Sequence, residues 1–157
     1  MGVDFMYEYY KGYVIREGNE GVSGVQLRQL YQDVGWISTS LPQWQNEKFE
    51  IALKYSAWAF TVWYEEELVG MVRVVSDRVM VASIQDLIVK SEHRKKGIGR
   101  KLVALCIQKL PHCNWSVQTT PENYEFYRKC SFEMADTTKN TSLVYNGFIK
   151  ARIDGHR

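Results

Sequence analysis

Cysteine and proline are scarce in this sequence, and long apolar runs are missing. The three cysteines, Cys106, Cys113 and Cys130, lack the spacing of a metal site and are an odd number for a disulfide framework. We therefore expect reduced thiols, no bound metal and a cytoplasmic location. The 3 prolines and 11 glycines exclude collagen-like repeats and low-complexity linkers. No apolar stretch reaches the ~18–20 residues of a membrane span, and residues 1–10 show no signal-peptide pattern, so we expect no membrane partner.

The composition is that of a folded domain with a full core. Hydrophobic residues make up 45% of the 157 residues and charged residues 24%, which excludes a disordered chain. A chain of about this length buries roughly 68–70% of its unfolded surface, so it can fold without a metal or a disulfide. We expect one domain over residues 1–157, and the 13% share of aromatic residues indicates a well-filled core or a cleft lined with rings.

The net charge of +2 hides one concentrated basic segment. Residues 90–101 contain six basic residues and a single acid, Glu92, so this segment carries +5 while the rest of the chain sums to −3. A compact positive patch on a slightly acidic body indicates a site for a small polyanion. The segment has no aromatic residues between its basic ones, so we expect no nucleic-acid partner.

Hydrophobic periodicity predicts helices alternating with strands in the second half of the chain. Ser23 and Gln26 form a capping-box pattern before an apolar stripe that ends near Gly35. In the strand expected at 83–89, alternation places Ile84, Asp86 and Ile88 on one face. Helices are expected at 23–34, 42–54, 98–110 and 122–130, and strands at 58–64, 68–76, 83–89, 115–119 and 142–148. This order predicts an α/β fold with helices on the sheet faces.

The segment 86–102 leaves a strand, crosses a basic loop with two glycines and enters a helix. Backbone N–H groups in the first turn of a helix lack partners, and the helix dipole adds positive charge there. Glycines allow a ligand to approach the backbone, so the segment has the features of a pyrophosphate cradle. A Rossmann fingerprint would need a small residue in place of Leu102, and a Walker A loop would need Gly-Lys-Ser/Thr where Gly99 precedes Arg100. By itself, a glycine pair at this place is also compatible with an ordinary turn.

Two motifs resemble the Gcn5-related N-acetyltransferase (GNAT) superfamily. The residues Arg94 to Gly99 resemble its Arg/Gln-x-x-Gly-x-Gly/Ala motif, and 123–132 resembles its Asn-x-x-x-Phe-Tyr-x-Lys-x-Gly-Phe block, with Ser131 in place of glycine. The similarity covers roughly residues 22–135 and is that of a small bacterial-type member. Residues 30–36 and 49–56 are weakly similar to the arylamine (serotonin-type) acetyltransferases.

The resemblance implies both a fold and a donor substrate. The fold would be α/β (α+β), with a mixed, mostly antiparallel central sheet splayed between its fourth and fifth strands and helices on both faces. Acetyl-CoA would be the donor, and its pyrophosphate and 3′-phosphate match the basic segment. The residues implied in donor binding are Leu87, Ile88 and Val89 beside the pantetheine arm, Arg94, Lys95, Lys96, Gly97, Ile98, Gly99 and Arg100 around the pyrophosphate, and Asn123 in the following helix.

The chemistry of acetyl transfer needs a neutral amine and a proton for the departing thiolate. The resemblance places Tyr127 as the general acid. Asp86 is the candidate base or amine ligand, because its Leu and Ile neighbours could raise the pKa of its carboxyl group. The alternative is a purely structural role, in which Asp86 forms hydrogen bonds with nearby backbone. Arg73 is expected to pair with a carboxylate, and Tyr31 and Trp36 could line the acceptor site.

The expected function is acetyl-CoA-dependent transfer to a primary amine of a small molecule by direct attack on the thioester. A protein acetyltransferase acting on an N-terminus or lysine, and a non-catalytic CoA-binding regulatory module, remain alternatives. The sequence does not identify the acceptor, and a homodimer through terminal strands stays open.

Overall fold

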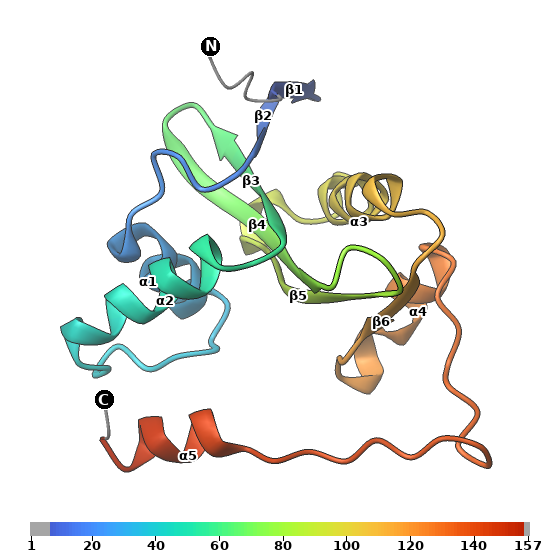
Figure 1. Ribbon diagram of the computed structural model, residues 1–157. Coiled ribbons are helices and arrows are strands. Elements are labelled where there is room, and N and C mark those ends of the chain that lie inside the picture. The colour runs from blue at the N-terminus through green and yellow to red at the C-terminus, as the bar shows by residue number, and fades with distance from the viewer. Residues whose placement is uncertain (1–6, 156–157) are drawn as a thin grey trace.

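The computed structural model describes residues 7–155, apart from the side chain of Arg152. Residues 1–6, 156 and 157 lie outside the described part, and with them most of the N-terminal segment in which no signal pattern was expected. The six strands follow the sheet order β1-β2-β3-β4-β5-β6 (Figure 1). They are β1 (Tyr7–Tyr10), β2 (Tyr13–Glu17), β3 (Trp58–Tyr64), β4 (Glu67–Ser76), β5 (Val81–Val89) and β6 (Asn114–Val117). The helices are α1 (Gly24–Asp33), α2 (Asn46–Lys54), α3 (Ile98–Lys109), α4 (Tyr124–Lys129) and α5 (Gly147–Ile153), with short 3₁₀ turns at Gln43–Gln45, Ser91–His93 and Pro121–Asn123.

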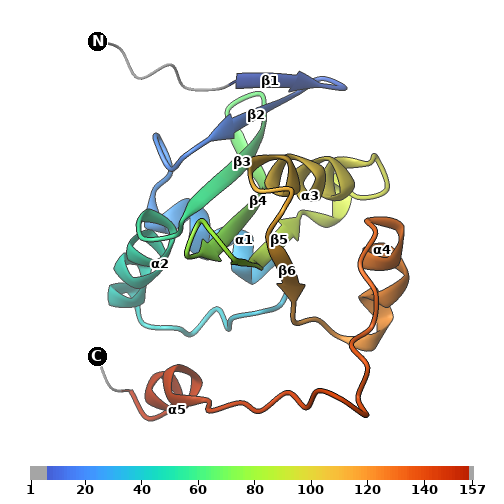
Figure 2. The same cartoon turned by 45° about the vertical axis from the view of Figure 1, so that its right-hand side comes forward.

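The sheet is mixed and carries helices on both faces. Neighbouring strands from β1 to β5 are antiparallel, and only β5 and β6 run parallel. Helices α1 and α2 cover one face, where Leu27, Leu30 and Leu53 pack on the sheet, whereas α3 and α4 lie against the other (Figure 2). The fold predicted from the resemblance is therefore confirmed.

The first two strands were not predicted, although the sequence contains a signal for them. More buried and more exposed residues alternate along the two strands on either side of Lys11-Gly12. Both turn residues have positive φ (49° and 85°), as a two-residue type I′ hairpin requires. Tyr13 and Ile15 of β2 are buried in the core. Both strands of this hairpin precede the strands predicted at 58–64, 68–76, 83–89 and 115–119, so the expected splay lies between the fifth and sixth strands, β5 and β6.

The start of α1 follows its predicted capping box. The Ser23 hydroxyl accepts from the Gln26 backbone N–H, and the Gln26 side chain accepts from the Ser23 backbone N–H. Two of the unpaired donors at the helix start are thereby satisfied. The expected helix at 42–54 divides into the 3₁₀ turn at Gln43–Gln45 and α2, so its regular part begins later than Pro42.

A bulge in β5 overturns the expected face assignment. Met71 pairs with Ile88 and Arg73 with Gln85, so two β5 residues, Asp86 and Leu87, lie opposite one β4 residue. Asp86 has φ 49°, and the extra residue reverses the alternation beyond it. Ile84 consequently packs on the α3 side and Ile88 on the α1 side. The prediction that Ile84, Asp86 and Ile88 share a face was wrong, because alternation holds only for an unbroken ladder.

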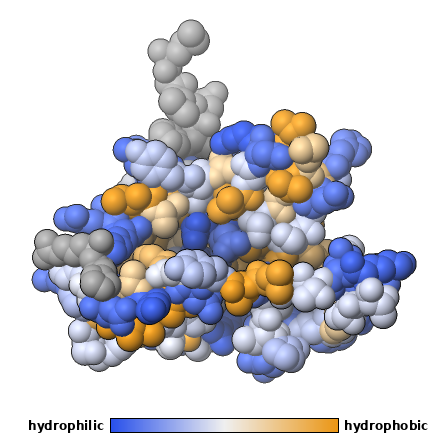
Figure 3. Space-filling model, turned by 60° about the horizontal axis from the view of Figure 1, so that its bottom comes forward, coloured by the Kyte–Doolittle hydropathy of each residue, from blue (hydrophilic) through white to orange (hydrophobic). Residues whose placement is uncertain are grey.

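The strand predicted at 142–148 was also wrong. Residues 133–146 form no regular element, and α5 begins at Gly147. Leu143, Val144 and Tyr145 are exposed, and apolar side chains stand among hydrophilic ones on the face that Figure 3 shows. The alternation of apolar and polar residues in this segment therefore does not correspond to a half-buried strand. Among the described residues, β6 is the outer strand of the sheet. Pairing of two copies through terminal strands stays a prediction.

Ser131 ends α4 in a Schellman-type turn. The Phe132 N–H donates to the Tyr127 carbonyl and the Ser131 N–H to the Arg128 carbonyl, both at 3.0 Å. Ser131 has φ 69°, a conformation that a side chain disfavours by about 1–2 kcal/mol. The turn thus forms without the usual glycine, at a cost in stability.

We expect Ser131→Gly to raise the free energy of unfolding by about 0.5–1 kcal/mol. Glycine removes the steric strain of a side chain at φ 69°, and this gain exceeds the cost of the greater conformational entropy that glycine gives the unfolded chain. Urea denaturation followed by circular dichroism would measure the change. Ser131→Ala is the matched control, since it keeps a Cβ at the same φ and should bring no gain. Equal stabilisation by both variants would contradict the explanation.

Candidate active site

The loop between β5 and α3 leads into a helix whose first backbone N–H groups are unpaired. Gly97 precedes the helix with φ 85°, no side chain caps α3, and the first helical hydrogen bond runs from the Lys101 N–H to the Gly97 carbonyl. The N–H groups of residues 98–100 therefore have no partner within the helix and carry the positive end of its dipole. Lys95 also has a left-handed backbone (φ 59°), which shapes the basic turn before Gly97. This geometry fits a pyrophosphate.

Side chains fasten the loop to the sheet. Arg94 Nε donates to the Val89 carbonyl at 2.9 Å, Tyr13 Oη lies 2.8 Å from His93 Nδ1, and Lys96 Nζ donates to Tyr13 Oη at 3.2 Å. Tyr13 lies 80 residues before His93, in the hairpin that was not predicted, so no local pattern links the two residues. The loop is thus held at both ends by β2 and β5.

Not every basic residue of the segment is free for a ligand. Lys90 is 7% exposed and pairs with Asp33, at 3.1 Å, and with Glu67. Burial opposes the charge of Lys90, but its two acidic partners leave its pKa raised. Lys101 pairs with Glu8. The charge that faces a ligand is therefore smaller than the +5 counted along the sequence.

The two glycines of the loop serve different purposes. A Cβ at Gly97 would lie 2.6 Å from Tyr10 Oη, and the positive φ disfavours a side chain as well. A Cβ at Gly99 would lie 3.1 Å from the Phe126 ring, so this glycine allows α4 to approach α3. Both glycines were expected beside the ligand, which stays a prediction, and Gly99 in addition allows the close packing of α3 and α4.

β5 and β6 separate where the donor arm was expected. Their parallel pairing ends at Ile84 and Val117, so the edge of β5 from 85 to 89 has no strand beside it on that side among the described residues. This edge includes Leu87, Ile88 and Val89, whose backbone was expected to face the pantetheine arm. An extended ligand can add to such an edge as a strand would.

Tyr127 lies in α4 on the α3 side of the sheet. It is 8% exposed, and its ring packs edge-on against Phe126 and Phe132. Burial, with a smaller contribution from Cys130, raises the pKa of the phenol to about 12. Among the residues that the structure describes, none forms a hydrogen bond with its hydroxyl, which leaves that hydroxyl free to donate to a ligand.

Asn123 ends the 3₁₀ turn before α4 and is exposed. Its side-chain Nδ2 donates to the hydroxyls of Thr119 and Thr120 at 3.2 and 3.1 Å, and its side chain does not cap the helix. These bonds orient the amide so that its oxygen is left for a ligand. Its spacing of four residues from Tyr127 places both on one side of the α4 turn.

Asp86 lies at the bulge and faces α1. Its Oδ2 pairs with Arg73 Nε and accepts from Tyr31 Oη at 2.7 Å. The expected carboxylate partner of Arg73 is therefore confirmed, whereas the immediate contacts of Asp86 are polar rather than apolar. Burial, and then the Asp86 charge, raise the pKa of the Tyr31 phenol well above its usual range, which keeps Tyr31 a hydrogen-bond donor. Both contacts are made to Oδ2, so Oδ1 is available to a ligand.

Aromatic rings surround Tyr31 on the α1 side. Phe49 stacks on Tyr31 with 4.9 Å between ring centroids, and Trp36 lies at 5.9 Å in a tilted arrangement. Trp36 is half exposed, and its expected place at an acceptor site stays a prediction. The carboxylate of Asp86 thus lies at the sheet side of an aromatic cluster.

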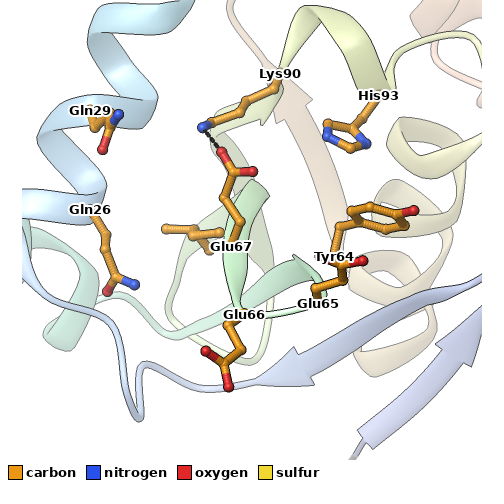
Figure 4. A pocket seen from close by; sticks show the side chains of 9 residues that line it. Gln26, Gln29, Tyr64, Glu65, Glu66, Glu67, Lys90 and His93 are labelled. Atoms are coloured by element: carbon orange, nitrogen blue, oxygen red, sulfur yellow. Dashed lines mark hydrogen bonds and ion pairs between the residues drawn. The ribbon is translucent and has the colours of Figure 1, made fainter.

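A cavity of about 550 Å³ lies between α1, the β3–β4 turn and the start of the loop that joins β5 to α3 (residues 90–97, called the phosphate loop below) (Figure 4). Lys90 and Glu67 point toward one another in it, and its other polar groups are mainly glutamates and glutamines. It includes neither Tyr127 nor Asp86, the two residues that were predicted to be catalytic. Among residues 7–155, no group of three His, Cys, Asp or Glu is placed to hold a metal ion. Within the same range, no helix is long and apolar enough to cross a membrane.

Comparisons with known proteins agree with this geometry. Residues 25–132 match the sequence profile of the acetyltransferase (GNAT) family. An uncharacterized N-acetyltransferase, ycf52, of the alga Pyropia yezoensis is 29% identical over 121 residues, which cover 73% of this chain and 67% of the relative. A GNAT-family acetyltransferase structure from Streptococcus pneumoniae superposes with a TM-score of 0.71 at 28% identity, covering 85% of this chain and 96% of that one. The glucosamine-6-phosphate N-acetyltransferase of Arabidopsis thaliana shares the fold at 18% identity, with a TM-score of 0.62 over 85% of this chain and 99% of that one.

Proposed function

This chain belongs to the acetyltransferase (GNAT) family, and we propose that it transfers the acetyl group of acetyl-CoA to the primary amine of a small molecule. The observation that carries the proposal is the uncapped N-terminus of α3 beside the open edge of β5. The first feature suits the pyrophosphate and the second suits the pantetheine arm. Members of the family use acetyl-CoA, and the residues that would hold it are Gly97, Arg100 and the β5 edge from Leu87 to Val89.

In this proposal the amine and the thioester approach from opposite faces of the sheet. Asp86 and its aromatic neighbours lie on the α1 side, while Tyr127 lies on the α3 side. The gap beyond Ile84 and Val117 joins the two sides. Acetyl-CoA supplies an activated acetyl group there. Asp86 Oδ1 holds the ammonium or takes its proton, and the Tyr127 hydroxyl protonates the departing thiolate.

A panel of amines tests the acceptor class. Thiol release from acetyl-CoA would be followed with polyamines, arylamines, amino acids, aminoglycosides and peptides bearing a free N-terminus or lysine, against an amine-free blank. We expect turnover above the blank with at least one small amine. Acetylation confined to peptides would overturn the small-molecule assignment, and CoA binding without turnover on any amine would indicate a regulatory module.

We expect Asp86→Asn to lower turnover while acetyl-CoA affinity is retained. The variant keeps the shape of the side chain but removes the charge that would hold the ammonium or accept a proton, so the acidic limb of the pH–rate profile should also change. Steady-state rates against pH, with calorimetry for acetyl-CoA, would measure both effects. A wild-type rate with an unchanged profile would leave water as the base.

A structural role for Asp86 needs its own control, because Asp86→Asn also leaves the Arg73 guanidinium without its partner. The double variant Asp86→Asn/Arg73→Gln removes both charges. If Asp86 served only to balance Arg73, the double variant should recover activity. If Asp86 acts on the amine, activity should stay low in both variants.

A further inference from the structure

The turn of the β1–β2 hairpin lies against the phosphate loop. Lys11 Nζ donates to the Lys96 carbonyl at 3.1 Å across 85 residues of sequence. Tyr10 Oη fills the space beside Gly97, only 2.6 Å from where a Cβ would lie. The hairpin therefore forms one wall of the loop, and nothing in the family motifs pointed to it.

Lys11 occupies a turn position that ordinarily favours other residues. It is the first central residue of the type I′ turn, with φ 49°, where asparagine, aspartate or glycine fit best. A lysine in this left-handed conformation destabilises the turn. Unfavourable backbone conformations held in place by a fold often mark functional positions.

A shallow, open basic pocket lies between the hairpin and the start of α3. It measures about 350 Å³ and is lined by Tyr10, Lys11, Gly97, Arg100 and Lys101. Lys101 has an acidic partner in Glu8, but within residues 7–155 neither Lys11 nor Arg100 has an ion-pair partner. Cations that converge without counter-charges repel one another, and a multiply charged anion between them would remove that repulsion.

We propose that Lys11, with Arg100 and Lys101, binds the 3′-phosphate of coenzyme A. The inference rests on the proposed use of acetyl-CoA. The N–H groups at the start of α3 can satisfy the pyrophosphate, but the donor carries a third phosphate that needs its own counter-charge. The basic pocket lies beside those N–H groups, and the β1–β2 hairpin becomes part of the donor site.

The substitution Lys11→Asn tests this with little risk to the fold. Asparagine suits the type I′ position better than lysine, so the variant should unfold at equal or higher urea concentration. Its affinity for CoA should fall about tenfold, as for one lost charge-assisted contact, while its affinity for 3′-dephospho-CoA should stay within about twofold of wild type. Lys54→Asn, at an exposed lysine of α2, is the matched control and should change neither affinity.

Calorimetry with wild type and both variants at low and at physiological salt separates the outcomes. The proposal is supported if Lys11→Asn loses affinity for CoA but not for 3′-dephospho-CoA, and if this loss becomes smaller at higher salt. Equal losses for CoA and 3′-dephospho-CoA, or no loss for either, would overturn it while the proposed function stands. If wild type binds neither ligand, the proposed function itself fails, and this inference fails with it.

Discussion

Replacing Tyr127 by phenylalanine should lower the rate constant of acetyl transfer by about 10²–10⁴-fold, the usual contribution of a general acid. The phenol stays protonated at neutral pH because burial raises its pKa to about 12, and it can donate to a developing thiolate whose own pKa is about 8.5. Single-turnover kinetics would measure the rate constant of the chemical step. Only the hydroxyl is removed, so the ring contacts with Phe126 and Phe132, and acetyl-CoA affinity, should be retained.

The raised pKa adds a second check on Tyr127. A general acid acts in its protonated form, so activity should be lost only as pH rises through the pKa of the folded protein. An ordinary tyrosine would lose its proton near pH 10, whereas Tyr127 should keep it until about 12. The wild-type rate constant should therefore not fall as pH passes 10. The defect of Tyr127→Phe should also shrink with an aryl thioester, whose leaving group needs less protonation.

Retention of rate would give Tyr127 a different role. If folded Tyr127→Phe transfers acetyl groups within about twofold of wild type, with chemistry limiting, the residue only packs α4 against the sheet. Solvent or another side chain would then supply the proton. α4 packs against α3 through Phe126 and Gly99, so a change in this packing would lower the stability of the protein. Urea denaturation of Tyr127→Phe should therefore accompany the kinetic experiment.

The phosphate loop could be predicted because it is local in sequence. Gly97, the basic residues and the following apolar helix stripe all lie within residues 86–110, and each has a conformational meaning of its own. The structure bears out the strand, loop and helix that these signals predicted. The same holds for the capping box of α1, which depends on two residues three positions apart.

The contacts that sequence reasoning missed depend on distant segments or on an irregular ladder. The partner of His93 and the wall formed by Tyr10 come from a hairpin about 80 residues earlier, and no local pattern links them to the loop. The bulge at Asp86 could not be read from alternation, because an inserted residue shifts the pattern without changing composition. Apolar and polar residues alternate at 142–148, which led to the prediction of a strand. The segment is exposed and pairs with no strand of the described sheet.

Replacing Gly97 by aspartate should weaken acetyl-CoA binding by at least ~2 kcal/mol, or roughly 30-fold. The new carboxylate would lie at the start of α3, where the pyrophosphate is expected. It would repel the pyrophosphate, and it would also neutralise the positive end of the helix dipole that favours an anion there. Its Cβ would in addition press on Tyr10 Oη. Calorimetric titration of acetyl-CoA into the folded variant measures the loss directly.

Gly97→Asn separates the charge of the aspartate from its shape. Asparagine and aspartate have nearly the same size, and both tolerate the left-handed backbone at φ 85° better than other side chains do. The asparagine variant should therefore carry the steric part of the loss without the repulsion, and bind acetyl-CoA more tightly than the aspartate variant. The difference between the two should shrink as salt is raised, because ions screen an exposed charge.

Equal affinities for wild type and Gly97→Asp would place the donor phosphates elsewhere on the molecule. Equal losses in both variants at every salt concentration would leave the contact with Tyr10, rather than the phosphate, as the reason that position 97 is glycine.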